Sequence, residues 1–304
     1  MNFFNKNIKS VLANFSTDNL IVACSGGVDS MVLLHCLLQL NQKVKVAHVN
    51  YQLRGEDSEL DAQLIKDFCL KHAIEFHEKT INLGVYLEKN GGNLQQEARK
   101  IRYNFFQELL SSPNDKIVLA HHLDDQIEHF FLNLGRGANI NGLGGMKILD
   151  GYLFRPLLET SRQEILKYAK ENNVEWREDV SNSKNDYARN KLRNVFIPEM
   201  LQYNENLVSD IVLVMETFRA TQEEISTKVA SIVSHIECFN ELRFSDFDEL
   251  TEDERIELLR KLKLKGIFAK ELAKLRTAEN GKFLFVAKQH LKIVRAKDCF
   301  KFVS

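Results

Sequence analysis

The first half of the chain alternates short apolar runs with longer segments whose apolar residues recur at helical spacing. Runs such as "NLIVAC" and "KVKVAHVN" are typical of buried parallel strands, whereas "EDSELDAQLIKDFCLKH" is typical of an amphipathic helix. Strands are predicted at 19–24, 43–50, 73–80, 115–122 and 151–158. Helices are predicted at 29–40, 56–72, 93–110, 123–137 and 161–173. This repetition predicts an α/β fold, a Rossmann-like parallel sheet with helices on both faces.

The pattern changes near residue 200. A helical period runs from about Asn204 to Val233, and a second amphipathic helix is predicted over 250–266. Residues 282–303 then alternate apolar and polar positions, as half-buried antiparallel strands do. We therefore predict two domains, a catalytic α/β domain at 1–200 and a helical connector with a small α+β domain at 201–304. Capping-box pairs mark the starts of two helices, at Ser161–Glu164 and Thr251–Glu254.

Composition places the chain among ordinary globular proteins. The 304 residues are 44% hydrophobic and 27% charged, which is enough apolar material for a buried core. No stretch is long and uncharged enough to span a bilayer, and the N-terminus lacks the apolar run of a secretory signal. Five scattered cysteines form no C-x-x-C pair, which argues against a zinc site or a redox motif. We expect a cytoplasmic protein without a membrane contact; a homo-oligomer is compatible with these features.

Charge is distributed unevenly along the chain. The net charge is −1, but Arg260–Ser304 contains 13 lysines and arginines against 3 acidic residues, so the rest of the chain is acidic. Such asymmetry indicates a polyanionic partner for the basic segment. A solvated lysine-rich surface is the simpler alternative, and charge alone leaves the two equally open.

One stretch between the first predicted strand and the first predicted helix carries chemistry, "SGGVDS" at residues 25–30. Gly26 and Gly27 allow a sharp turn and a close approach to a ligand. The hydroxyls of Ser25 and Ser30, together with the free N–H groups of the helix start, can donate hydrogen bonds to phosphate oxygens. The lysine of the G-x-x-x-x-G-K-[ST] loop is absent, and the glycine spacing differs from G-x-G-x-x-G. The stretch therefore predicts a different kind of phosphate loop.

Asp29 is an unexpected neighbour for a phosphate, because a carboxylate repels it. The arrangement makes sense if Mg²⁺ lies between them, since this ion is usually held by carboxylates together with phosphates. A glycine turn in which Asp29 merely caps the helix is the alternative. The complete S-G-G-x-D-S pattern between a strand and a helix favours the phosphate loop.

This loop resembles the signature of the PP-loop superfamily, the N-type ATP pyrophosphatases. The resemblance implies that ATP is bound and attacked at its α-phosphorus, so that pyrophosphate leaves and an adenylated substrate remains. Further stretches resemble the tRNA(Ile)-lysidine synthetases of this superfamily, in family order. They are "HVNYQLRGEDSELD" from His48, "GGNLQQEARKIRYNFF" from Gly91, "AHHLDDQIEHFFLNLGRGANINGLGGM" from Ala120 and "EDVSNSKNDYARNKLRNVFIPEM" from Glu178. Together the matches cover about Asn19 to Met200.

The resemblance implies roles for individual residues. The residues that would bind ATP are Ser25, Gly26, Gly27, Val28, Asp29, Ser30, His48 and Arg102. Those that would carry catalysis are Asp29, Asp125 and Arg193, with Mg²⁺ on the first two. The substrate lysine would be held by Asp124 and Glu128, and the division of roles among the three acids of this helix stays open.

Physical arguments accompany these assignments. Asp124 and Glu128 lie one helical turn apart and share a face, where acids can hold Mg²⁺ or an ammonium, or simply cap the helix. Arginine engages phosphate with two parallel hydrogen bonds, which suits Arg102 and Arg193. Arg99 has the position of an ordinary surface residue.

This chain matches the lysidine synthetase pattern at some histidine positions and departs from it at others. His122 matches the histidine of that family, and His48 ends a strand on the expected ligand side, where a buried structural histidine is the alternative. Tyr51 stands where a second histidine is usual, which weakens a proton-transfer role at that position. His129 stands where threonine is usual, so the hydroxyl of the family is absent there.

The resemblance implies ligation of free L-lysine to carbon 2 of the wobble cytidine in a CAU-anticodon tRNA(Ile), with ATP and Mg²⁺. The basic segment would then contact tRNA phosphates. One alternative is a tRNA thiolase of the same superfamily, which the absence of a C-x-x-C pair disfavours. A second is an ATP-dependent small-molecule amide ligase, which would not need the basic segment. A third is a nucleotide-binding tRNA scaffold without catalysis, which the acids beside the phosphate disfavour.

Overall fold

The computed structural model describes residues 3–15, 17–178, 188–264, 269–286 and 290–303. The chain divides into two compact units. Unit 1 comprises residues 1–137 and 145–211, and unit 2 comprises residues 138–144 and 212–304. The division falls inside the long helix α11 (Leu207–Phe239). The division predicted from the sequence, a catalytic domain at 1–200 and a helical connector with a basic tRNA-binding domain at 201–304, stays a prediction.

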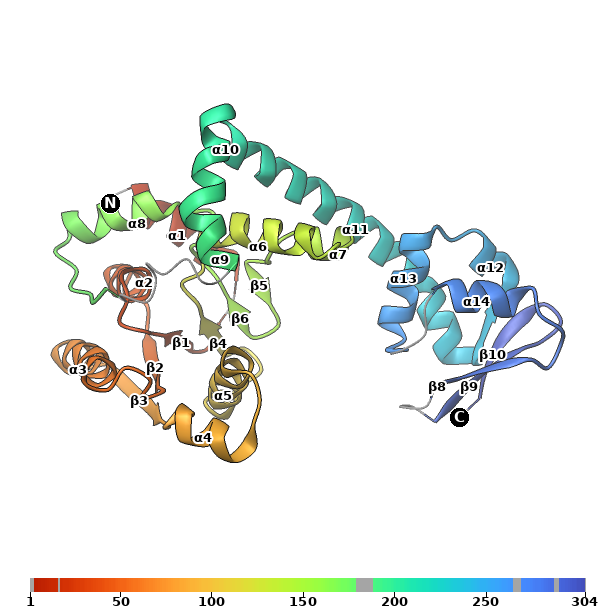
Figure 1. The fold of residues 1–304 in the computed structure, drawn as a ribbon, viewed down its shortest axis with the longest axis horizontal. Coiled ribbons are helices and arrows are strands. Elements are labelled where there is room, and N and C mark those ends of the chain that lie inside the picture. The colour runs from red at the N-terminus through yellow and green to blue at the C-terminus, as the bar shows by residue number, and fades with distance from the viewer. Residues whose placement is uncertain (1–2, 16, 179–187, 265–268, 287–289, 304) are drawn as a thin grey trace. The chain divides into compact units, whose positions relative to one another are not determined.

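Unit 1 contains a six-stranded sheet in the order β3-β2-β1-β4-β6-β5. Its strands are β1 (Leu20–Ala23), β2 (Val44–Asn50), β3 (Glu75–Thr80), β4 (Lys116–Val118), β5 (Leu149–Asp150) and β6 (Leu153–Phe154). Neighbouring strands run parallel, except that β5 runs antiparallel to β6 at the edge. The predicted Rossmann-like sheet is therefore confirmed (Figure 1).

Helices cover both faces of this sheet. Besides the start of α11, the helices of unit 1 are α1 (Phe3–Ala13), α2 (Val28–Gln39), α3 (Glu56–Lys71), α4 (Leu83–Asn90), α5 (Leu94–Glu108), α6 (Leu123–Gly135), α8 (Arg162–Glu171), α9 (Ala188–Lys191), the π-helix η2 (Leu192–Phe196) and α10 (Ile197–Tyr203). Because strand side chains alternate between faces, Leu20 and Val22 of β1 pack with α2 and α8, whereas Ile21 packs with Phe105 of α5. The near-continuous apolar run of β1 follows from this burial on both sides.

The largest departure from the predicted elements lies at the sheet edge. One strand is predicted over 151–158, but the structure has a hairpin of the two short strands β5 and β6. Gly151 lies in the turn between them with a φ of +61°, a conformation that favours glycine. β6 ends just before Arg155 and Pro156, and proline has no N–H for a strand ladder.

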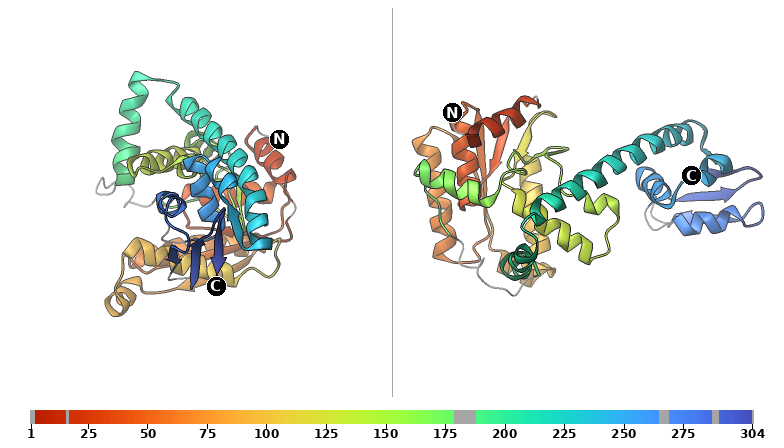
Figure 2. Two further views of the ribbon diagram at one scale, coloured as in Figure 1. Left: turned by 90° about the vertical axis from the view of Figure 1, so that its right-hand side faces the viewer. Right: turned by 90° about the horizontal axis from the view of Figure 1, so that it is seen from above.

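Unit 2 contains a four-stranded antiparallel sheet in the order β7-β10-β9-β8. Its strands are β7 (Glu241–Arg243), β8 (Phe283–Val286), β9 (Leu291–Arg295) and β10 (Cys299–Val303). Its helices are α7 (Ile140–Leu143), α11 from residue 212, α12 (Phe244–Asp248), α13 (Glu252–Lys261) and α14 (Ala269–Arg276). One hydrophobic core joins Val229 of α11 and Leu258 of α13 with Ile293 and Phe300 of the sheet. Strands β7 to β10 and helices α12 to α14 form the group of blue ribbons in Figure 2, and the predicted antiparallel strands are confirmed.

The helices predicted in the second half appear as α11 and α13 with shifted ends. At the start of α13, the Thr251 hydroxyl accepts a hydrogen bond from the Glu254 amide, and the Glu254 carboxylate accepts one from the Thr251 amide. The helix ends at Lys261, and residues 265–266 of the predicted helix lie outside the described part of the chain. Of the helices that the structure describes, none is long and apolar enough to cross a membrane.

Candidate active site

The predicted phosphate loop connects β1 to α2 and is organised by Ser30. Its hydroxyl donates to the Gly27 carbonyl (2.9 Å) and accepts from the Ser25 amide (3.2 Å). Gly26 has a φ of +86°, which only glycine adopts without strain. Gly27 is the N-cap residue directly before α2, and no side-chain hydrogen bond caps this helix. The alternative in which Asp29 caps the helix is therefore wrong, and the first amide groups of α2 stay available to an anion.

A pocket of about 550 Å³ opens at the carboxyl ends of β1, β2 and β4. The predicted ATP-binding residues that line it are Ser25, Gly27, Asp29, Ser30, His48 and Arg102; Gly26 and Val28 do not. Apolar wall residues come from β2 and α5, including Ala47, Val49 and Phe106. A pocket with a polar loop at one side and an apolar wall suits a nucleotide, at the sheet edge where open α/β folds bind ligands.

His48 lies buried in the wall of this pocket. One ring nitrogen, Nδ1, lies 2.9 Å from the Cys24 carbonyl oxygen. Because a carbonyl only accepts, Nδ1 carries the proton and Nε2 is left with a lone pair. Nε2 is buried and has no hydrogen-bond partner among the described residues. The imidazole can therefore accept a hydrogen bond from a donor group of a ligand in the pocket.

Asp29 is divided between two environments. One oxygen, Oδ2, lies 3.2 Å from the Arg162 guanidinium and 3.8 Å from Nε2 of His122. The other oxygen, Oδ1, is buried and has no hydrogen-bond partner within the described part of the chain. An unpartnered buried carboxylate oxygen is costly, so this atom is suited to receive a cation or a donor from a ligand.

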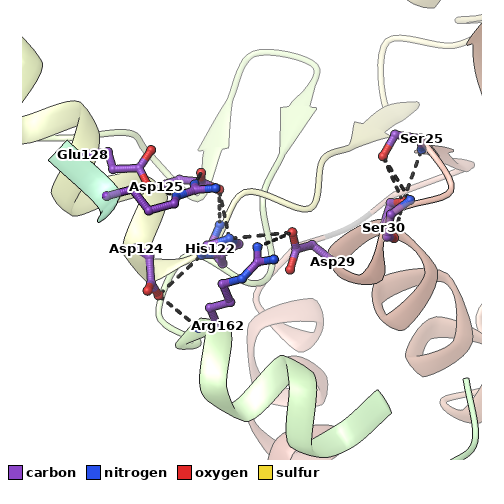
Figure 3. A network of polar contacts seen from close by, with 10 residues as sticks. Ser25, Asp29, Ser30, His122, Asp124, Asp125, Glu128 and Arg162 are labelled. Atoms are coloured by element: carbon purple, nitrogen blue, oxygen red, sulfur yellow. Dashed lines mark hydrogen bonds and ion pairs between the residues drawn. The ribbon is translucent and has the colours of Figure 1, made fainter. Parts of the chain in front are cut away.

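Three carboxylates surround the imidazole of His122, the N-cap residue directly before α6 (Figure 3). Its Nδ1 lies 3.5 Å from Asp124, and its Nε2 lies 3.5 Å from Asp125 and 3.8 Å from Asp29. Burial would lower the pKa of His122, but the three acids outweigh that effect and the pKa is raised. His122 thus connects the phosphate loop with the acids of α6.

Arg193 joins this cluster from the π-helix η2. Its guanidinium lies 2.5 Å from the buried carboxylate of Glu128 and 3.3 Å from that of Asp125. Burial would lower the pKa of Arg193, but the bond to Glu128 and the nearby acids outweigh this and raise it. The wider turn of a π-helix is often found at functional sites, and here it places the arginine against two acids of α6.

Comparisons with known proteins test the resemblance to the PP-loop superfamily. The family described as "PP-loop domain" matches residues 1–200. A tRNA(Ile)-lysidine synthase from Chlorobaculum tepidum is 33% identical over 261 residues, which are 82% of this chain and 79% of that protein. The chain belongs to the tRNA(Ile)-lysidine synthase family of PP-loop proteins.

Other members of the family are longer. A tRNA(Ile)-lysidine synthase from Clostridium tetani is 40% identical over 204 residues, 65% of this chain but only 43% of that relative. The chain therefore spans less than half of this relative and about four fifths of the one from Chlorobaculum tepidum. Among solved structures, the U34-tRNA thiolase NcsA from Methanococcus maripaludis aligns with a TM-score of 0.55 at 17% identity, over 70% of this chain and 76% of that one. This likeness shows a shared fold.

Within the PP-loop framework, the predicted site residues fall into two connected groups. The first group lines the nucleotide pocket, and the second is the acid cluster of Asp124, Asp125 and Glu128 with His122 and Arg193. Arg99 lies outside both groups, whereas Tyr51 lines the pocket. The Arg99 guanidinium lies 4.5 Å from the centre of the Tyr103 ring, and the Tyr51 hydroxyl donates to the Ala98 carbonyl at 2.9 Å.

The predicted Mg²⁺ ligands Asp29 and Asp125 differ in how well they suit a metal. Both oxygens of Asp125 are engaged, Oδ1 by Arg193 and Oδ2 by the backbone amide of His122. Only Oδ1 of Asp29 is free among these atoms. Within the described residues, no group of three or more His, Cys, Asp or Glu is arranged to hold a metal ion. The chain therefore fits an ion that takes one carboxylate oxygen and completes its shell with phosphates and water.

Arg162 is a site residue that sequence reasoning missed. Besides its ion pair with Asp29, its backbone amide donates to the Asp124 carboxylate at 2.9 Å, so it touches both groups of the site. One signal was present in the sequence. Arg162 is the first residue of α8, directly after the capping serine Ser161, where the helix dipole disfavours a cation. A cation at such a position needs a compensating anion, which Asp29 supplies.

Proposed function

We propose that this protein ligates L-lysine to carbon 2 of the wobble cytidine in a CAU-anticodon tRNA(Ile), using ATP and Mg²⁺. The observation that carries the proposal is the unbroken line of contacts from Asp29 through His122 to Asp125, Arg193 and Glu128. It joins a nucleotide pocket to a buried acidic cluster, as a reaction of an activated intermediate with an amine requires. The family membership of residues 1–200 agrees with it.

In the first step, the cytidine oxygen on carbon 2 attacks the α-phosphorus of ATP, the bond to pyrophosphate breaks, and an adenylated base forms. Ser25, Ser30 and the first amides of α2 hold the phosphate oxygens. Arg102 lies in the same pocket and can neutralise charge that develops on them. Mg²⁺, when bound with ATP, would offset phosphate charge beside Oδ1 of Asp29. Positioning and charge neutralisation are sufficient, since no covalent protein nucleophile is needed.

In the second step, the ε-amine of lysine attacks carbon 2 and AMP leaves with the bonding electrons of the carbon–oxygen bond. Asp124 and Glu128 hold the amine in place, because carboxylates favour an ammonium nearby. The nitrogen loses a proton as the new bond forms. His122 and the surrounding carboxylates lie together at this point, so the proton stays within the cluster.

Cys24 argues against the thiolase alternative. It lines the nucleotide pocket, but burial raises the pKa of its thiol, which therefore stays protonated and unreactive. Its neighbours within hydrogen-bond distance are Ser30 and Met31, not a second cysteine. We therefore propose that lysine, not sulfur, is the group that is transferred. We also propose that the protein binds its tRNA in the cytoplasm.

The decisive experiment compares two tRNA(Ile) transcripts, one with the CAU anticodon and one with uridine at the wobble position. With ATP, Mg²⁺ and labelled lysine, we expect label in the first transcript alone, with release of pyrophosphate and AMP. Asp29→Asn should reduce pyrophosphate release at least 100-fold and leave tRNA binding unchanged, because the loss of one preorganised charge at the phosphates typically costs that much.

The same assay separates the alternatives. Label that enters neither transcript, together with sulfur incorporation from a donor, would identify a thiolase. Pyrophosphate release without any tRNA would indicate a small-molecule ligase. Binding of tRNA by both the parent chain and Asp29→Asn, without label in either transcript and without pyrophosphate release, would mean that the chain acts as a scaffold and that the proposal is wrong.

A further inference from the structure

One face of the sheet in unit 2 carries exposed apolar and basic side chains. The strand register places Phe285 opposite Lys292, Lys292 opposite Val303, and Val294 opposite Lys301. Directly opposed residues of antiparallel strands point to the same side. The residues on this side, which we call the open face, include Phe283, Phe285, Lys292, Lys301 and Val303.

The other side of the same strands is the core of unit 2. Val286, Ile293 and Phe300 are almost fully buried, and they pack with residues of α12, α13 and α14. These helices lie beside the strands in Figure 1. Every second residue of these strands therefore belongs to the core. The aromatic residues of the open face lie on the opposite side and are not part of that core.

Phenylalanine is unusual on an open face. Phe283 is 54% exposed and Phe285 is 51% exposed, on adjacent same-side positions of the edge strand β8. The Nζ of Lys292 lies 5.4 Å from the centre of the Phe283 ring, so a cation sits against the aromatic pair. Lys301 and Arg243 are also exposed on this side. Of the three β7 residues that pair with β10, Arg243 and Glu241 lie on this side, and Glu241 is the acid.

We propose that the open face binds unpaired nucleotides of an RNA strand, with Phe283 and Phe285 stacked on bases and Lys292 and Lys301 on phosphates. Aromatic platforms on a sheet with flanking cations are suited to this ligand, because every base has a flat face and every phosphate a charge. A second copy of the chain would bring like charges together, whereas a polyanion is attracted. This inference rests on the proposed function, in that tRNA is the RNA that would be bound.

The test measures binding of the full chain to a fluorescent single-stranded oligoribonucleotide and to the tRNA(Ile) transcript. We expect Phe283→Ala with Phe285→Ala to weaken binding of both at least tenfold, since each stacked base contributes about that much. Replacing both with leucine should weaken binding almost as much, because leucine keeps the apolar area and loses the stacking. Tyrosine at both positions should restore it.

A charge variant and a matched control complete the design. Lys292→Ala with Lys301→Ala should lower the slope of log affinity against log salt by about 1.4, since each single-strand phosphate contact contributes about 0.7. Phe239→Ala removes an exposed phenylalanine of α11, outside the sheet, and should leave binding unchanged. Because all these side chains are exposed, the variants should keep the unfolding midpoint of the parent chain.

The outcomes separate this inference from the proposed function. If the parent chain ligates lysine but the double alanine variant binds tRNA as tightly as the parent, the inference that the open face binds RNA is wrong and the proposed activity stands. If no lysine is ligated but oligoribonucleotide binding needs the two phenylalanines, the open face stands and the activity is wrong. If leucine preserves binding, or if sedimentation shows a dimer that the alanine variant abolishes, the face contacts protein and the inference is overturned.

Discussion

At the scale of single residues, the site depends on how each oxygen of Asp29 is partnered. Arg162 holds Oδ2 at 3.2 Å, whereas Oδ1 is buried and free among the described residues. A cation that binds Oδ1 need not displace the arginine. Arg162 therefore acts as a positioning residue that fixes the carboxylate, and it stays bound to Asp124 through its own backbone amide.

Removing this side chain gives a sharp prediction. Arg162→Ala should weaken binding of Mg·ATP about fivefold to tenfold, the usual effect of losing a partly exposed charge-assisted hydrogen bond. Arg162→Lys should recover part of that loss, because lysine restores the charge without the geometry. Binding of AMP should not change, since AMP lacks the β- and γ-phosphates that we propose lie beside Asp29. Calorimetric titration of the parent chain and the two variants with both nucleotides measures this; equal weakening for AMP would contradict a role through Asp29.

At the scale of elements, helix α13 contains a buried acidic side chain that is ion-paired with a neighbouring arginine. On α13, the fully buried Glu257 accepts two hydrogen bonds from the guanidinium of Arg260, at 2.6 and 2.7 Å. Burial would raise the pKa of Glu257, but the bonds from Arg260 outweigh it and lower the pKa. A carboxyl group with a lowered pKa stabilises the fold above its unfolded pKa and ceases to do so as the pH falls through its folded pKa.

The expected consequence is a pH-dependent difference between parent and Glu257→Gln. At pH 7 the variant should unfold with a free energy about 1–2 kcal/mol lower, because a charged hydrogen bond is replaced by a neutral one. The difference should stay constant above about pH 5 and shrink as the pH falls below the ordinary glutamate value of about 4.3. Urea unfolding at several pH values measures it. Glu252→Gln, in the exposed first turn of the same helix, serves as the control; a pH-independent deficit in Glu257→Gln would refute the role of its charge.

At the scale of the whole molecule, the chain consists of two units that each have a core. Proteins with several cores commonly unfold in more than one transition. The one tryptophan of the chain, Trp176, lies in unit 1 and packs against its core, so its fluorescence reports that unit alone. The nucleotide pocket also belongs to unit 1, since all its lining residues precede residue 137.

Nucleotide binding should therefore protect one unit selectively. At a free Mg·ATP concentration of 100 times Kd, unfolding of unit 1 should cost about 2.7 kcal/mol more, because the ligand binds only the folded form. The midpoint of the Trp176 fluorescence transition should rise, while the transition of unit 2 should stay in place. Circular dichroism, recorded in parallel, follows both units. An equal rise in both transitions would show that the two units unfold together.

The basic segment Arg260–Ser304 is also a structural part of unit 2. It contributes β8, β9, β10 and α14, and residues such as Leu272, Ile293 and Phe300 lie in the core of unit 2. Deleting the segment would remove nearly half of that core and unfold the unit, so a loss of tRNA binding after deletion would not identify the contact surface. Substitutions of exposed residues on the open face test whether the segment contacts tRNA without unfolding the unit.

The order of strands and helices in unit 1 was largely readable from the sequence, because each apolar run must be buried on one or two sides and the periods of strands and helices differ. The phosphate loop could be located for the same reason, since glycines, serines and an acid between a strand and a helix have few other uses. The hairpin at β5 and β6 was missed because each strand is only two residues long, too short for any period.

The neighbours of each site residue depended on the tertiary structure. The sequence named Asp29, the acids of α6 and Arg193, but it gave no distance between segments that lie more than 60 residues apart. Only the packing of η2 with α6 brings Arg193 against Glu128, and only the packing of α8 with α2 brings Arg162 against Asp29. The open face depends in the same way on the register of β8, β9 and β10, because a shift by one residue would turn Phe283 and Phe285 into the core. Local periodicity thus determined the elements, and long-range packing decided which side chains meet.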